Sequence, residues 1–166
     1  MKITSRLARR EARNTVGVGA VVLALTGALL GAPGIASANP DQALLDLINQ
    51  QRAQAQPPCK PLTQNPQLQA AADREANDLA THPALFDTPP YHTGSDGSTA
   101  AQRIAAAGYV GSSSEIIAAG QDSDQGAVTG WMNSPGHKAA MLNCAYIDAG
   151  TASSGKYYVG VVAAPG

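Results

Sequence analysis

The sequence is poor in several of the residues that most often carry chemistry. Its 166 residues include two cysteines, one tryptophan and three histidines. Two cysteines without CxxC spacing give little support for a cysteine-rich zinc site. No serine lies in a GxSxG segment, so the nucleophile elbow of many serine hydrolases is missing. These absences leave few candidate residues for a functional site.

Positive charge is also scarce once the first residues are set aside. Residues 39–166 hold 6 Lys and Arg against 11 Asp and Glu, a net charge of −5. No basic stripe or Arg-rich helix is left in this part, which argues against nucleic acid as the main partner. No later segment is long and apolar enough to cross a membrane.

Residues 1–38 have the organisation of a secretory signal. A basic start is followed by the apolar run Val16 to Leu30 and by the small-residue cleavage pattern Ala36-Ser37-Ala38. An uncleaved anchor is the alternative, but the run is short and is interrupted by Gly and Thr. We predict cleavage after Ala38, secretion to the extracellular space, and one domain over residues 39–166, expected to be a monomer.

The two cysteines, Cys59 and Cys144, would then lie in an oxidising compartment. A disulfide between them is the economical prediction. A shared metal site is the competing interpretation.

Helix signals are clear in this domain. Asp41 is expected to cap a helix that ends before Pro57-Pro58. Asn65-Pro66 predicts a second helix that reaches about Thr81, and Thr99 with Gln102 has the spacing of a capping box. Asp124 is expected to cap a further helix. Residues 83–98, rich in Pro, Gly, Asp, Ser and Thr, are expected to form a loop.

Strand-like segments come late in the chain. Residues 113–118 are a short candidate, and residues 145–151 and 157–163 flank a turn. Helices without regular strand–helix alternation predict an α+β fold with a small antiparallel sheet covered by helices.

The segment GWMNSPGHKAAMLN, residues 130–143, and the Cys144 that follows it bring three scarce residue types together. Ser134 and Pro135 predict a helix start, which places His137 in the first turn at the positive end of the helix dipole. That field favours neutral imidazole, the form that binds a metal or accepts a proton. Trp131 lies just upstream, and Cys144 follows the segment.

Several segments together resemble the CAP superfamily of cysteine-rich secretory proteins, antigen 5 and pathogenesis-related proteins, and above all its small secreted bacterial SCP branch. They are LLDLINQQRAQ (44–54), LTQNPQLQAAADREANDLA (62–80), HTGSDGSTAAQRIAAAGY (92–109), SEIIAAG (114–120) and the 130–143 segment. The resemblance covers nearly all of residues 39–166. It implies a three-layer α-β-α sandwich with a central antiparallel sheet and a cleft.

The family's cleft commonly holds two histidines and two acidic residues that can bind a divalent metal such as zinc. By position, His92 and Glu115 match one histidine and one glutamate of that set. Ser134 stands where eukaryotic relatives have the second acidic residue, and Tyr157-Tyr158 lies where they have the second histidine. The bacterial branch instead offers His137, so His92, Glu115 and His137 are the candidate metal-binding or catalytic residues.

Two classes of function follow from the resemblance. The first, which the replacements favour, is a secreted binding module for a lipid, a sterol, or a cell-envelope or host partner. The second is a hydrolase that uses zinc or another divalent cation held by His92, His137 and Glu115. Whether the chain is an enzyme is left open by the sequence.

Overall fold

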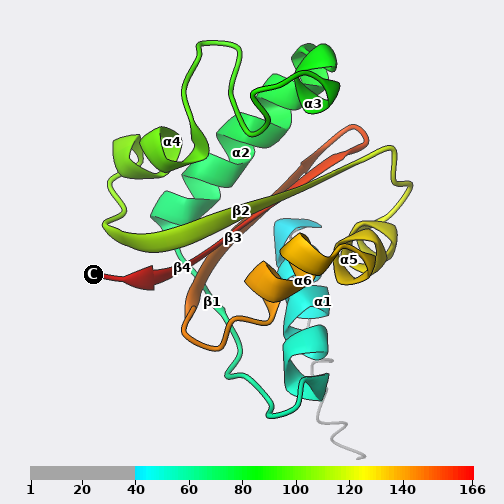
Figure 1. Ribbon diagram of the computed structural model, residues 1–166, viewed down its shortest axis with the longest axis vertical. Helices are drawn as coiled ribbons and strands as arrows, with labels where there is room; N and C mark the ends of the chain where they lie inside the picture. The colour runs from blue at the N-terminus through cyan, green and yellow to red at the C-terminus, as the bar shows by residue number, and fades with distance from the viewer. Residues whose placement is uncertain (1–39) are drawn as a thin grey trace, which may run out of the picture. The chain divides into compact units, whose positions relative to one another are not determined.

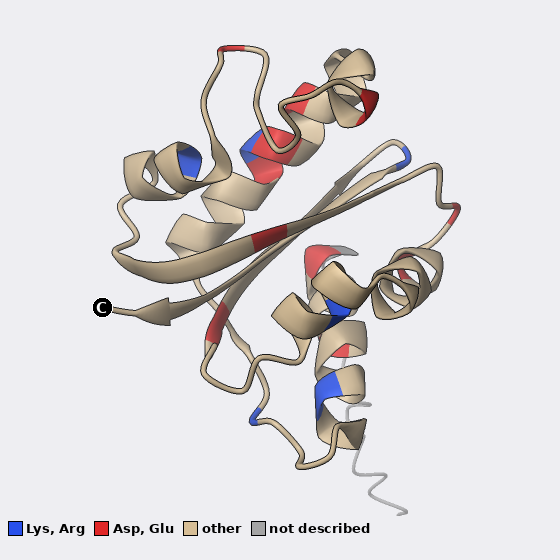
Figure 2. Ribbon diagram, viewed as in Figure 1, with Lys and Arg blue, Asp and Glu red and all other residues tan. Residues whose placement is uncertain are grey.

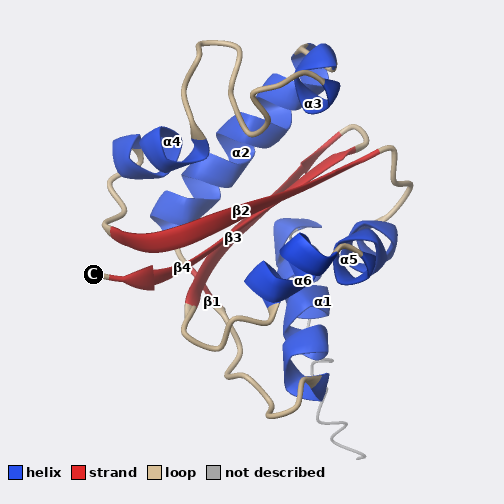
Figure 3. Cartoon of the chain, in the orientation of Figure 1, coloured by secondary structure: helices blue, strands red, loops and turns tan. Residues whose placement is uncertain are grey.

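A computed structural model describes residues 40–166, so the predicted signal segment lies outside the described part of the chain. In chain order, the described elements are α1 (Pro40–Gln54), β1 (Thr63–Gln64), α2 (Pro66–Thr81), α3 (Ala84–Asp87), α4 (Ala100–Ala106), β2 (Gly111–Ala119), α5 (Asp124–Asn133), α6 (Pro135–Met141), β3 (Asp148–Ser154) and β4 (Tyr157–Pro165). This arrangement confirms the predicted α+β class (Figure 3).

The sheet has the strand order β1-β3-β4-β2. Its three longer strands are antiparallel, with β4 between β3 and β2. The two-residue β1 joins the far side of β3 in parallel, which makes the whole sheet mixed. Strand β2 therefore forms one edge, and Glu115 lies in its middle, opposite Val161 of β4.

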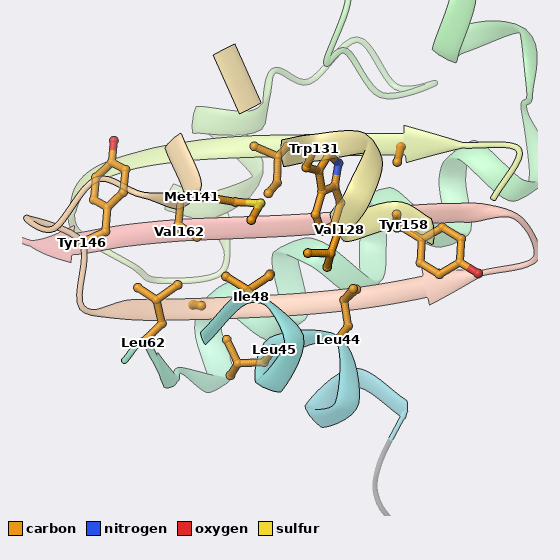
Figure 4. Close-up of a cluster of buried hydrophobic side chains, with 14 residues drawn as sticks. Leu44, Leu45, Ile48, Leu62, Val128, Trp131, Met141, Tyr146, Tyr158 and Val162 are labelled. Carbon is orange, nitrogen blue, oxygen red and sulfur yellow. The ribbon is translucent and has the colours of Figure 1, made fainter. Parts of the chain in front are cut away.

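Helices cover both faces of the sheet, as predicted for a three-layer sandwich (Figure 1). Alternate residues of a strand point to opposite faces, and neighbouring Ile116 and Ile117 accordingly belong to two different buried clusters. One cluster packs β-sheet side chains against α1, α5 and α6, with Trp131 in its middle (Figure 4). The other packs the opposite face against α2 and α4.

Several helix starts follow the predicted capping chemistry. The Asn65 side chain accepts hydrogen bonds from the backbone N–H groups of Gln67 and Leu68, and Thr99 forms a complete capping box with Gln102. Residue 108 is a glycine with φ 92° just after α4, a backbone conformation that suits the end of a helix.

Four local expectations were wrong. Ser123, not Asp124, caps α5, because its hydroxyl accepts from the N–H of Gly126. Helix α1 begins one residue before Asp41, which lies in its first turn. Ser134 is the N-cap residue of α6 but makes no side-chain capping bond, so Pro135 is the main start signal there. The predicted loop 83–98 contains the short helix α3.

Two long-range ties hold the end of α1 to the segment after α6. The predicted disulfide is present between Cys59 and Cys144, whose Cα atoms are 4.9 Å apart. Arg52 is fully buried, and its guanidinium donates to the carbonyls of Lys60, Met141, Asn143 and Tyr146 over 2.6–3.0 Å. Within residues 40–166, no helix combines the length and the apolar character that a membrane span requires.

Candidate functional site

The loop after α3 presents His92 in an unusual backbone conformation. Its φ of 61° is left-handed, and it is the one non-glycine residue with positive φ in the described part of the chain. Such a conformation persists only where neighbouring contacts hold it. Here Arg103 of α4 donates to the His92 carbonyl over 3.4 Å and to the Ser98 carbonyl over 2.7 Å.

His92 is also fixed through its side chain. Its Nδ1 lies 2.9 Å from Oε1 of Glu115, whose side chain is 2% exposed. Arg103 Nη2 lies 2.9 Å from both oxygens of the same carboxylate. An ionised Glu115 only accepts hydrogen bonds, so the proton of neutral His92 belongs on Nδ1 and its Nε2 is the free acceptor. Glu115 thus orients the ring.

Glu75 of α2 completes this cluster, and it was not predicted from the sequence. It is 1% exposed, and its Oε2 lies 3.0 Å from Arg103 Nη2. The approach is close enough for an ion pair but has the wrong angle for a hydrogen bond, so both Glu75 oxygens are left without a hydrogen-bond partner. Burial and the nearby Glu115 carboxylate raise the pKa of Glu75 to about 7, against the opposing effect of Arg103. In Figure 2, red acidic positions lie on α2, and one lies in the middle of β2.

A signal for Glu75 was available in the sequence. Leu68, Ala72 and Leu79 mark the apolar face of α2, and Glu75 is seven residues after Leu68 on that same face. A carboxylate at such a position is costly unless a partner is supplied. Arg103, beside the buried Ile104, is the corresponding signal in α4.

Of the residues in this cluster, Glu75 and His92 line a pocket of about 290 Å³ at the β2 edge of the sheet. Its polar lining comes from Glu75, Asp87, His92, Thr93 and His137. Its apolar lining comes from Leu79, Leu85, Phe86, Tyr91 and Ile117. The walls therefore derive from α2, α3, the following loop, β2 and α6, which brings both helical layers to one site.

His137 lies in the first turn of α6, as predicted, and shares this pocket with His92. Burial is the main cause that lowers its pKa, and the nearby His92 adds to the effect. The direction agrees with the predicted neutral imidazole, although the prediction invoked the helix dipole.

The predicted zinc ligands are not arranged as a ready three-ligand site. Both Glu115 oxygens accept from Arg103, and one of them also contacts His92 Nδ1. Glu115 as a direct ligand therefore does not fit this arrangement. Among residues 40–166, no group of three or more His, Cys, Asp or Glu side chains is placed to hold a metal ion. Zinc binding stays a prediction.

Several residues outside this cluster have structural roles. Trp131 is 1% exposed in the core, and Asp96-Gly97 forms a turn in which the Asp96 carboxylate accepts from Ser98. Tyr158 is buried in the same core as Trp131. Tyr157, on the opposite face, meets the pocket residue Phe86 with ring centroids 6.3 Å apart.

Comparison with solved structures gives the same fold. An extracellular protein with an SCP domain from Bacillus anthracis matches with a TM-score of 0.67 and 22% identity, over 75% of this chain and 40% of that one. An outer surface protein from Borrelia burgdorferi matches with a TM-score of 0.58 and 23% identity, over 75% and 92% of the two chains. A cysteine-rich secretory protein from Staphylococcus aureus matches with a TM-score of 0.57 and 21% identity, over 79% and 40%.

This chain thus spans less than half of the Bacillus and Staphylococcus chains. No curated protein sequence matches it significantly. The model of the cysteine-rich secretory protein (CAP) family matches residues 45–162. Together with the α-β-α fold, this match shows that the chain belongs to the CAP family.

Proposed function

We propose that this CAP domain is exported and acts as a binding module whose pocket takes a small, largely apolar ligand. The supporting observation is the composition of the pocket, in which Leu79, Leu85, Phe86, Tyr91 and Ile117 face a polar side formed by Glu75 and the two histidines. Ligand sites typically combine apolar walls with a few polar groups that fix orientation.

The size of the pocket narrows the ligand class. Its volume of about 290 Å³ is at the small end of the range for ligand sites, about 300–1,000 Å³. A short lipid chain, or the end of a cell-envelope component, suits this volume better than a whole sterol.

Export is supported by the signal-like residues 1–38 and by relatives that are described as extracellular or as outer surface proteins. The expected mature chain begins at Asn39. Mass spectrometry of the exported protein tests this: an uncleaved N-terminus would contradict it.

The second candidate is the divalent-metal-dependent hydrolase. The observation in its favour is that His92 and His137 line one pocket and that Glu115 holds His92 with Nε2 free. The engagement of Glu115 by Arg103 weighs against it. We therefore rank it below the binding module.

Calorimetric titration of the purified protein with zinc separates the two candidates. The binding-module proposal expects no tight binding. Tight binding that is lost in both His92→Ala and His137→Ala, but kept in His82→Ala, would establish the metal site and justify a screen of peptides and esters for hydrolysis. His82 is the matched control because it caps the end of α2 outside the pocket lining.

A further inference from the structure

The buried cluster beside the pocket has more negative than positive groups. Arg103 is its one guanidinium, and it faces two carboxylates, Glu75 and Glu115. Glu115 receives the hydrogen bonds of Arg103 on both oxygens, whereas Glu75 receives none. A buried carboxylate without a hydrogen-bond donor is costly, and the ion pair with Arg103 does not supply one to Glu75.

Glu75 lines the pocket, which is where such a partner can be supplied. Among the described residues, no Lys or Arg lines the pocket, whereas the exposed Asp87 adds a second acidic group. The lowered pKa of His137 keeps that imidazole neutral near pH 7. The pocket therefore attracts positive charge.

The aromatic lining favours the same kind of group. Phe86 and Tyr91 both border the pocket, and Tyr91 is 62% exposed. The negative faces of aromatic rings attract ammonium groups, including alkylated ones. Leu79 and Ile117, both buried, supply an apolar wall next to Glu75 for the rest of such a molecule.

We propose that the pocket binds an organic ammonium ion carried on a short apolar body, with Glu75 as its counter-ion. This inference rests on the proposed ligand-binding function and names the chemistry of the ligand head group. An ammonium donates hydrogen bonds and carries the charge that the cluster lacks, so it satisfies Glu75 in both respects. The pKa of Glu75, about 7, agrees with this: burial and the Glu115 carboxylate raise it by more than the single Arg103 cation lowers it.

Three probes with the same eight-carbon chain test the inference: octylammonium, octanol and octanoate. Binding to the purified protein at pH 7.5 is measured by calorimetry. We expect octylammonium to bind about tenfold more tightly than octanol, and octanoate to bind weakest. If octanol or octanoate binds as tightly as octylammonium, the ammonium inference is wrong but the binding function stands. If none of the three binds, both the binding function and the inference are overturned.

The Glu75→Gln variant locates the preference in the pocket. Glutamine keeps the size of the side chain and removes its charge, so the advantage of octylammonium over octanol, about tenfold, should be lost. Asp46→Asn is the matched control, since Asp46 is an exposed carboxylate of α1 outside the pocket lining. An unchanged preference in Glu75→Gln would overturn the assignment of Glu75. If that variant does not fold, the head-group ranking in the unmodified protein still decides the inference.

Discussion

At the residue scale, buried charges are handled in two opposite ways. Arg52 has four backbone carbonyls as partners and is fully satisfied in the core. Glu75 is equally buried, but neither of its oxygens accepts a hydrogen bond. The first arrangement stabilises the fold, while the second stores an unfavourable interaction beside a pocket. Titratable groups with shifted pKa values, such as Glu75, are concentrated at functional sites.

The raised pKa of Glu75 predicts a stability that depends on pH. The folded-state pKa of about 7 lies above the ordinary value of 4.5, so the folded protein binds more protons than the unfolded chain between these values. The free energy of unfolding should therefore fall as the pH rises from about 4.5 to 7, by at most about 3 kcal/mol.

Urea denaturation of Glu75→Gln at pH 5 and pH 8 checks this prediction. In this variant, the free energy of unfolding should fall less between pH 5 and pH 8. The variant should also be more stable than the unmodified protein at pH 8. Asp46→Asn should keep the original slope. If the free energy of unfolding depends on pH equally in Glu75→Gln and in the unmodified protein, Glu75 is not the cause of the dependence.

Replacing Arg52 by lysine should be strongly destabilising. A single ammonium cannot reach the four carbonyls that the planar guanidinium contacts, so several buried acceptors lose their donors. We expect a loss of about 2–4 kcal/mol in the free energy of unfolding. Arg74→Lys, at an exposed ion pair with Asp96, should cost far less, because water screens this pair. A similar loss in both variants would argue against this role of Arg52.

The sequence showed part of this residue-level picture. His92, Glu115 and His137 were identified because a family motif marked each of them, and the structure brings both histidines to one pocket. Glu75 and Arg103 belong to no such motif, and their meeting depends on α2 and α4 packing side by side on the same face of the sheet. Three of the four carbonyl partners of Arg52 lie about 90 residues away in sequence, so local patterns could not show them.

At the element scale, the position of α2 on the sheet depends on Gly150 of β3. A Cβ atom there would overlap the backbone carbonyl group of Leu68, so an alanine requires the helix to move away from the strand. The helix and strand backbones are thus in direct contact.

Two glycine-to-alanine variants with opposite effects test this contact. Gly150→Ala should lower the free energy of unfolding by about 3 kcal/mol or more, because helix and strand cannot both keep their places. Gly130→Ala, within α5, adds a Cβ with nothing within 4 Å and should stabilise by about 0.5–1 kcal/mol. Thermal unfolding shows whether each variant is more or less stable than the unmodified protein. A neutral Gly150→Ala would refute the contact.

Element boundaries were predictable where they depend on local chemistry. The side chains of Asn65 and Thr99 accept hydrogen bonds from backbone N–H groups two or three residues later. These helix starts could therefore be predicted from neighbouring residues in the sequence. The pairing of β1 with β3 joins residues that are 85 positions apart, and two residues carry no periodicity. Helix α3 was not predicted for the same reason: its four residues are too few to show a helical periodicity, and they lie in a segment with loop composition.

At the scale of the whole molecule, the disulfide closes a long loop. Cys59 and Cys144 are separated by 85 positions, so the bond removes much conformational freedom from the unfolded chain. The double variant Cys59→Ala, Cys144→Ala should lose about 4 kcal/mol in the free energy of unfolding. Guanidinium denaturation measures the loss, and reduced protein should match the variant. A loss below about 1 kcal/mol would show that Arg52 and the core hold this region without the bond.

The fold class was predictable because helices and strands follow one another without regular alternation and because five motifs stand in the family's order. The position of the pocket was not predictable from that order. It arises because residues of α2 and α6, from opposite helical layers, line one pocket together with Ile117 of the edge strand β2.

This placement has a consequence for how occupancy could be observed. His137 belongs to a helix on one face of the sheet, and Glu75 and Leu79 belong to a helix on the other. A molecule bound between them would couple the local opening of the two layers, since either layer must release it in order to unfold. Amide hydrogens of α2 and α6 would then exchange more slowly together, and this joint protection would report binding whatever the chemical identity of the ligand.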